Sequence, residues 1–257
     1  MILPKISKQQ TRILYFLYKF RYLHTYHIQK LLQLKNPHRT QEWLKNMREL
    51  GFIRLYKTPK TFKEHATPYV YQLGLKARHI LKNDPECAMN VLDNVYNKKD
   101  QSDAFVDRCL SIADLYLFFE SQTEKNEELN FFTESELVNY PYFPNTEHGA
   151  GAYITLTKDN IIRSYLLEYF GRDITPGELR YRFKKYLKYV NSGEWEANTN
   201  GEAFPTLLFV FANTRRKNYI RIYARSVLNK KIDENLELFV TTKAKIITEN
   251  KSIWEKC

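Results

Sequence analysis

The order of periodic segments in the first eighty residues constrains the fold more than any other feature of this chain. Three segments with apolar residues at helical spacing are followed by two β-type segments and a short closing helix: 7–20, 25–32, 38–50, 52–56, 68–73 and 75–81. Ser7 can cap the first helix, and Gly51 ends the third because glycine adopts the left-handed conformation that closes helices. Three helices followed by a two-stranded ribbon predict a winged helix-turn-helix.

Positive charge is concentrated in the same part of the chain. Residues 1–83 contain 17 Lys and Arg against three acidic residues, whereas residues 84–151 contain four basic and 14 acidic residues. The whole chain carries a formal net charge of +11. A basic block attracts polyanions, and on this fold it predicts double-stranded DNA as the partner. The alternative is a solvated basic face without a partner, and a membrane surface is not favoured because no basic amphipathic helix stands apart from the folding pattern.

The third helix is where base contacts are expected, because a helix end fits the major groove of DNA. The candidate contacts are its polar side chains: Arg39, Thr40, Gln41, Lys45, Asn46 and Arg48. Three lysines of the loop between the strands, Lys57, Lys60 and Lys63, are expected to contact phosphates without reading sequence. The alternative is a solvated helix face in a winged helix that contacts proteins. Winged helices often read paired half-sites, so a homodimer is a further expectation.

The remaining two-thirds of the chain has a different pattern. The polar stretch 84–102 is the best candidate for a linker between a DNA-binding domain at 1–83 and a second domain at 103–257. Helical and β-type segments are mixed in the second domain: helices at 103–120, 176–190 and 215–228, and strands at 131–138, 152–157, 161–170, 204–212 and 236–241. The chain is therefore expected to be a mixed α/β protein of two domains.

Several classes of protein are not supported by the sequence. The three cysteines, Cys87, Cys109 and Cys257, share no metal-binding spacing and are expected to be reduced thiols, which is typical of a cytoplasmic protein. His24 and His27 have no acid or cysteine near them in sequence, so local capping is expected rather than a metal site. The sequence contains no Walker loop, HExxH or Gly-x-Ser-x-Gly motif, and no apolar stretch is long enough for a signal peptide or a membrane span.

Five segments spread over most of the chain carry a resemblance to a known family: QQTRILYFLYKFRYLHTYHIQKLL, TQEWLKNMRELGFIRLY, YVYQLGLKARHIL, YLLEYFGRDITPGELRYRFKKYLKYV and FPTLLFVFANTRRKNYI. In these segments the chain resembles the replication-relaxation family of plasmids and integrative elements. The resemblance implies a winged helix joined to a domain similar to restriction-endonuclease-like nucleases. It also implies a role in plasmid replication or in DNA relaxation before transfer, with other replication or transfer proteins as partners.

The resemblance also implies a place for catalytic acids, because carboxylates on neighbouring strands hold the Mg²⁺ of such nucleases. Glu136 and Glu168 are the weak candidates for the two outer acids. The chain departs from the family pattern at 147–152, which contains no aspartate, and at Phe170, where an acid or a lysine is expected. Arg182 stands where the family's helix carries a lysine. These departures favour a non-catalytic domain without a cofactor, and Mg²⁺ is expected only if the nuclease alternative holds.

Two other functions remain as alternatives. A metal-dependent DNA nickase needs a working acidic site in the second domain. A ligand-responsive transcription regulator needs a closed apolar pocket there, although core packing explains the many aromatic residues more simply. Five cations near the C-terminus form either a second phosphate-binding surface or a solvent face: Arg215, Arg216, Lys217, Arg221 and Arg225.

Overall fold

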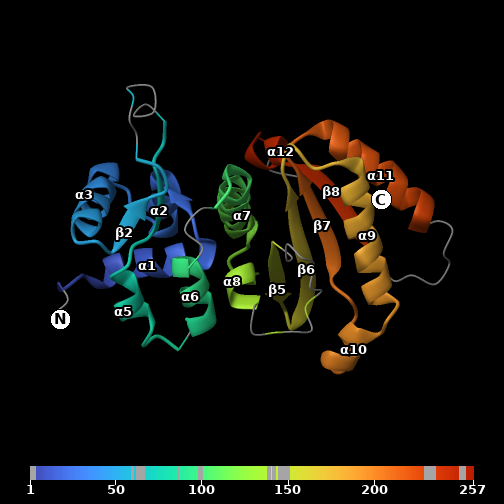
Figure 1. The fold of residues 1–257 in the computed structure, drawn as a ribbon. Helices are drawn as coiled ribbons and strands as arrows, with labels where there is room; N and C mark the ends of the chain where they lie inside the picture. Colours follow the sequence, from blue (N-terminus) through green and yellow to red (C-terminus); the bar gives the residue numbers. More distant parts are fainter. Residues whose placement is uncertain are drawn as a thin grey trace. The chain divides into compact units, whose positions relative to one another are not determined.

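The computed structural model of the protein describes residues 4–58, 61, 67–85, 87–97, 101–137, 140, 143, 151–228, 236–248 and 253–257. Backbone contacts divide the chain into two compact units, Met1–Leu117 and Phe118–Cys257, which we call the N-terminal unit and the C-terminal unit. Figure 1 shows the helices and strands of both.

The N-terminal unit contains helices and strands at the six segments predicted from the sequence, in the predicted order. In chain order these are α1 (Lys8–Phe20), β1 (Leu23–His24), α2 (Thr25–Leu31), α3 (Pro37–Glu49), β2 (Ile53–Leu55), β3 (Val70–Leu73) and α5 (Ala77–Leu81), followed by α6 (Met89–Asn97) and the first part of α7 (Asp103–Gln122). Strand β3 lies between β1 and β2 and is antiparallel to both. The short strand β1 therefore adds a third member to the expected ribbon.

Short-range signals in the sequence explain where α1 and α3 begin and end. At α1, the Gln10 N–H donates to Ser7 Oγ at 3.3 Å and the Ser7 N–H donates to Gln10 Oε1 at 2.9 Å. This reciprocal pair satisfies two N–H groups at the helix start. At α3, Asn36 Oδ1 accepts the His38 N–H at 2.9 Å. Gly51 follows α3 with φ of +79°, a conformation that favours glycine over residues with a Cβ atom.

The division between the units lies later in the chain than the sequence suggests. The expected linker, 84–102, contains α6, whose Leu92 side chain is fully buried. Just before α6, the Ala88 N–H donates to the Tyr18 hydroxyl of α1 at 2.8 Å. The division itself falls within α7, so much of that helix belongs to the N-terminal unit. Contacts of the α6 region with α1 and of α7 with α2 are the reason for this difference.

A six-stranded sheet forms the centre of the C-terminal unit. Its strands lie in chain order: β4 (Glu128–Thr133), β5 (Ala152–Lys158), β6 (Ile161–Phe170), β7 (Thr206–Phe211), β8 (Leu238–Thr242) and β9 (Glu255–Lys256). Strand β5 is antiparallel to both β4 and β6, β7 is parallel to both β6 and β8, and β9 is antiparallel to β8. The predicted mixed α/β fold class is confirmed.

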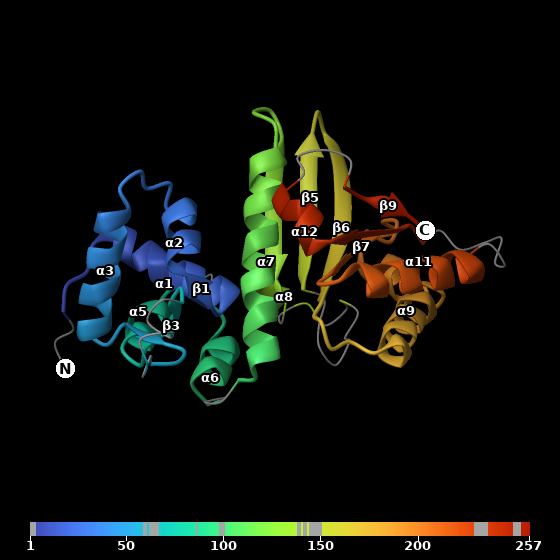
Figure 2. The same cartoon turned by 90° about the horizontal axis from the view of Figure 1, so that it is seen from above.

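Helices connect and cover the parallel part of this sheet. The helices of the unit that follow α7 are α8 (Glu134–Leu137), α9 (Pro176–Val190), α10 (Glu194–Asn198), α11 (Thr214–Leu228) and α12 (Lys243–Thr248). Figures 1 and 2 show α9 and α11 side by side on one face of the sheet. Aromatic side chains such as Phe170, Phe183 and Phe209 fill the space between these helices and the strands. Among the described residues, no helix is long and apolar enough to cross a bilayer.

Candidate nucleic-acid interface

Helix α3 presents most of the predicted DNA-contacting side chains to solvent. The exposed members are Arg39, Gln41, Lys45, Asn46 and Arg48. Thr40 is the exception, because its side chain is completely buried. It lies four residues before Leu44 and seven before Met47, which are also buried, so all three share the stripe that faces the core. This position corrects the expectation that Thr40 contacts DNA.

Gln41, Lys45 and Arg48 form a continuous stripe along α3. They are four and three residues apart, the spacing that places side chains on one side of a helix, and we call them the α3 stripe. Glu42 and Glu49 are also exposed on this helix and follow Gln41 and Arg48 directly in sequence. The acidic pair lies between the α3 stripe and the remaining predicted residues, so the basic face is divided rather than continuous.

The other flank of α3 is held by contacts within the N-terminal unit. The Arg39 guanidinium lies 5.0 Å from the centre of the Trp43 ring, a cation–π arrangement. Asn46 Oδ1 accepts a hydrogen bond from Gln10 Nε2 of α1 at 3.2 Å. A partner at this flank would compete with these contacts, which favours the α3 stripe as the candidate contact surface.

The loop between β2 and β3 begins with a paired lysine. Lys57 Nζ lies 2.6 Å from the Asp103 carboxylate, and the Tyr56 hydroxyl donates to the same carboxylate at 3.0 Å. The Lys57 hydrogen bond, followed by that of Tyr56, lowers the pKa of Asp103 below its usual value. Part of the Lys57 charge is thus neutralised by the start of α7. Lys60 and Lys63 lie outside the described residues.

A polar cluster that the sequence did not predict fastens α2 to α7. His27 is fully buried, and its Nε2 lies 2.9 Å from Asp114 Oδ1. Its Nδ1 accepts the His24 N–H at 3.1 Å, which places the ring proton on Nε2, where it is donated to Asp114. The Tyr26 hydroxyl also donates to Asp114. Burial, and then this hydrogen bond, raise the pKa of Tyr26 above its usual value.

This cluster gives the two histidines a structural role. His27 shares a capping box with His24 at the start of α2, in agreement with the capping expectation. The spacing of the histidines is visible in the sequence, but Asp114 is 87 residues beyond His27. No short-range pattern indicates that contact.

The first acidic candidate, Glu168, is enclosed in the C-terminal unit. Its side chain on β6 is fully buried, and Arg182 Nη1 of α9 lies 2.5 Å from its Oε1. The same guanidinium lies 5.5 Å from the centre of the Phe170 ring. A protein cation therefore occupies the position next to this carboxylate, where a nuclease would need Mg²⁺.

The second acidic candidate, Glu136, caps the start of the short helix that contains it. The expected strand 131–138 ends at Thr133 and continues as α8, which contains Glu136. Glu136 Oε2 accepts the Thr133 N–H at 2.8 Å and the Thr133 hydroxyl at 3.2 Å. Within the part of the chain that the structure describes, no three His, Cys, Asp or Glu side chains gather as a metal-ion site requires.

The cations of α11 bind the C-terminal strand. Lys217 Nζ and Arg221 Nη1 each lie 2.5 Å from the Glu255 carboxylate of β9, and Lys245 Nζ of α12 lies 3.3 Å from it. Arg225 donates to a β9 carbonyl at 3.2 Å. The hydrogen bond from Lys217 is the largest cause that lowers the pKa of Glu255. Lys217, Arg221 and Arg225 thus hold β9 in place. For these three cations, this structural role replaces the two expected alternatives, a phosphate-binding surface and a solvent face.

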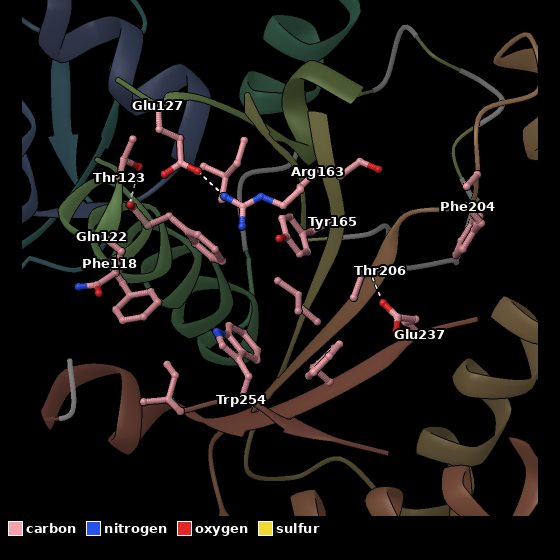
Figure 3. Close-up of a pocket in the computed structure, with 17 residues that line it drawn as sticks. Phe118, Gln122, Thr123, Glu127, Arg163, Tyr165, Phe204, Thr206, Glu237 and Trp254 are labelled. Carbon is pink, nitrogen blue, oxygen red and sulfur yellow. Dashed lines mark hydrogen bonds and ion pairs between the residues drawn. The ribbon is translucent and has the colours of Figure 1, made fainter. Parts of the chain in front are cut away.

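The C-terminal unit also contains a cavity of about 740 Å³. Aromatic side chains contribute much of its wall: Phe118, Phe119, Tyr165, Phe204, Phe239 and Trp254. Figure 3 shows Phe118, Tyr165 and Trp254 directed into the same hollow. Burial raises the pKa of Tyr165, as expected for a hydroxyl in apolar surroundings.

Charged groups at the cavity wall are paired. Arg163 lies 2.5 Å from Glu127, and both side chains line the cavity. Glu237 lies 2.5 Å from Lys256 and accepts the Thr206 hydroxyl at 3.4 Å. The wall therefore combines apolar rings with polar groups whose charges are balanced.

Comparisons with known proteins give limited information. No family model matches the chain, and no curated protein matches it. A solved structure of the restriction endonuclease FokI is similar to the chain, with a TM-score of 0.34 and 12% sequence identity. The match covers 97% of this chain and 46% of the FokI chain, so the chain spans less than half the length of that enzyme. A likeness at this level assigns neither a fold family nor an activity.

Proposed function

We propose that the protein binds double-stranded DNA through the N-terminal unit, with the α3 stripe in the major groove. The observation that carries this proposal is the position of Gln41, Lys45 and Arg48, which are all exposed along one side of α3. They belong to a segment in which basic residues greatly outnumber acidic ones. A helix surface of this kind provides both attraction for phosphates and groups that fit base edges.

The three residues of the α3 stripe have different roles in this proposal. Arg48 and Gln41 carry planar groups that can form two hydrogen bonds with a base edge, and each such contact contributes about 1–3 kcal/mol of discrimination. Lys45 provides a point charge for a phosphate, as does Lys57 at the start of the wing. The proposal also includes phosphate contacts by Lys60 and Lys63, and for these two residues it rests on the sequence alone.

The experiment compares two double variants that remove the same charge from the N-terminal unit. Lys45→Ala with Arg48→Ala removes two cations of the α3 stripe, and Lys8→Ala with Lys82→Ala removes two exposed cations elsewhere. Each variant is titrated with a random duplex and with a duplex selected for tight binding. The first variant is expected to lose its preference for the selected duplex, and the second to retain it.

Equal behaviour of the two variants would contradict the assignment of the α3 stripe. Circular dichroism tests whether each variant is folded. All four substituted residues are exposed, so the substitutions should have little effect on stability. A general loss of binding in both variants, with the preference retained, would mean that the α3 stripe contributes charge and does not read sequence.

A more specific role is part of the proposal and rests on the sequence resemblance. In this role the protein acts in the cytoplasm on a plasmid or mobile element, in replication or transfer control, as a homodimer and with other replication or transfer proteins. The C-terminal unit holds DNA or partners without catalysing a reaction, because Arg182 already neutralises Glu168. Incubation of supercoiled plasmid with the protein and Mg²⁺ or Mn²⁺ tests this; nicking that Glu168→Gln abolishes would support the nickase alternative instead.

A further inference from the structure

We propose that the cavity of the C-terminal unit is a binding site for an uncharged small molecule with an aromatic ring. This goes beyond the DNA contacts proposed for the N-terminal unit and uses different residues. The site lies on the face of the sheet opposite α9 and α11, between strands β6, β7 and β8 and the end of α7.

The size of the cavity is the first argument. The hollow is partly open to solvent, so it is a surface pocket rather than a void in the core. Its volume of about 740 Å³ falls within the roughly 300–1,000 Å³ that is typical of small-molecule sites. It is therefore large enough to receive a ligand of that size.

The shape and chemistry of the wall are the second argument. The rings of Phe118, Tyr165 and Trp254 face the same hollow in Figure 3. Phe239 of β8 and Leu208 of β7 contribute further apolar surface. Rings prefer to pack against other rings in offset or edge-to-face arrangements, so a planar aromatic group fits this wall well.

The balance of charge identifies the ligand as uncharged. Glu127, Arg163 and Glu237 are the charged side chains among the described residues that line the cavity, and each has an oppositely charged partner. An anion or cation in the cavity would lose part of its hydration without gaining an unpaired counter-charge, which is unfavourable. The Tyr165 hydroxyl, and the Thr206 hydroxyl as an acceptor because it donates to Glu237, are polar groups that can orient a neutral ligand.

The same balance argues against a base of single-stranded nucleic acid as the occupant. Proteins that bind single strands combine stacking rings with a positively charged groove that follows the backbone. Here the ion pairs at the wall join each cation to a carboxylate. A free small molecule needs no such groove.

The test uses the full chain and N-phenyl-1-naphthylamine, an uncharged aromatic probe that fluoresces in apolar surroundings. Trp254 lines the cavity, so bound probe should accept its excitation energy. Trp254→Phe should reduce this transfer and leave the part that comes from Trp195, whose ring centre lies 5.6 Å from that of the cavity-lining Phe204. The affinity of this variant is measured separately, from the probe's own fluorescence, because Trp254 is part of the wall.

Replacing one of two alanines by phenylalanine shows where the probe binds. Ala203 is exposed and lines the cavity, whereas Ala197 is exposed on α10 and does not line it. Ala203→Phe is expected to weaken probe binding roughly ten-fold or more, a difference of about 1.4 kcal/mol, and Ala197→Phe to leave it within about two-fold. Both variants keep the same number of tryptophans, so their fluorescence can be compared directly.

Several results would overturn the proposal. They are absence of saturable probe binding, equal effects of Ala203→Phe and Ala197→Phe, and tighter binding of the anionic analogue 8-anilinonaphthalene-1-sulfonate than of the neutral probe. Displacement of the probe by a short single-stranded oligonucleotide would assign the cavity to a nucleic-acid base instead. None of these measurements depends on duplex binding, so failure here is distinguishable from failure of the proposed DNA function.

Discussion

Several side chains that could hold a ligand are already held by the protein itself. The buried Glu168 carboxylate is paired with Arg182, and the buried His27 ring donates to Asp114. A metal ion at Glu168 would have to displace a guanidinium 2.5 Å away, and one at His27 would have to replace an internal hydrogen bond. At the scale of single residues, these groups therefore contribute to the fold through their internal partners.

The pair of Glu168 and Arg182 gives a prediction about stability. Arg182→Leu leaves a fully buried carboxylate without this partner, and we expect the free energy of unfolding to fall by about 3–5 kcal/mol. Replacing both residues by leucine should recover most of the loss, because no unpaired charge remains. Urea denaturation of the two variants measures this. A cost under about 1 kcal/mol for Arg182→Leu would show that the pair is not structural.

The cluster around Asp114 gives a second prediction. Asp114→Ala leaves the buried His27 N–H and the Tyr26 hydroxyl without their acceptor, so we expect a loss of about 1–3 kcal/mol in stability. Asp114→Asn retains an acceptor oxygen and should lose less. Thermal denaturation followed by circular dichroism compares the variants. Equal losses in the two would indicate that the charge of Asp114, rather than its hydrogen bonds, matters.

At the scale of helices and strands, ion pairs between elements decide how much positive charge is available to a polyanion such as the proposed DNA partner. The start of α7 neutralises part of the charge on Lys57 after β2. The three cations around Glu255 are engaged with β9 in a similar way. A count of lysines and arginines therefore overstates the positive charge that these other elements offer to a polyanion. The α3 stripe is the more effective surface by comparison.

Asp103→Asn should strengthen duplex binding. The substitution removes the carboxylate that pairs with Lys57 and leaves that lysine available for a phosphate. The logarithm of the binding constant should then depend more steeply on salt, by roughly one unit of slope. Fluorescence anisotropy at several salt concentrations measures the slope. In a Lys57→Gln background the same substitution should change the slope much less, and an unchanged effect there would contradict the assignment.

The attachment of β9 should depend on pH. The folded pKa of Glu255 lies below its ordinary value of 4.5, so the stability that it contributes is present above that value and is lost as the pH falls toward the folded pKa. Glu255→Gln should therefore flatten the decline of unfolding free energy in this acidic range. Glu202→Gln, at an exposed glutamate, is the control. Identical curves for the two variants would contradict the role of Glu255.

Local signals made helices α1, α2 and α3 and strands β2 and β3 of the N-terminal unit predictable, whereas β1 and α6 were not predicted. Ser7 and Gly51 mark helix ends through rules that act within a few residues. The first acidic candidate was also assigned to the correct strand, since Glu168 lies on β6. The end of β4 was not predictable from alternation alone, because Glu136 caps a helical turn directly after Thr133.

Contacts between distant segments were not predictable. The pairing of His27 with Asp114 and that of Lys217 with Glu255 join residues far apart in the chain. Thr40 shows the same limit within one helix, because a small polar residue on the core stripe cannot be distinguished by residue type from one on the DNA face. An apolar pocket in the second domain is considered only for the regulator alternative, and core packing is preferred, because abundant aromatic residues do not show whether they enclose a space.

At the scale of the whole molecule, the two units have different chemistry. The first 83 residues are strongly basic, whereas the segment that follows is acidic. The C-terminal unit combines paired charges with an aromatic cavity. We therefore expect attraction for DNA to arise mainly from the N-terminal unit, and small-molecule binding to arise from the C-terminal unit.

The measurement that tests the DNA proposal most directly is a titration of the intact protein with a random duplex at increasing salt. We predict measurable binding at low ionic strength that weakens steeply as salt rises, with a slope of about 0.9 for each phosphate neutralised. Binding that is absent at low ionic strength, or that does not respond to salt, would contradict the account.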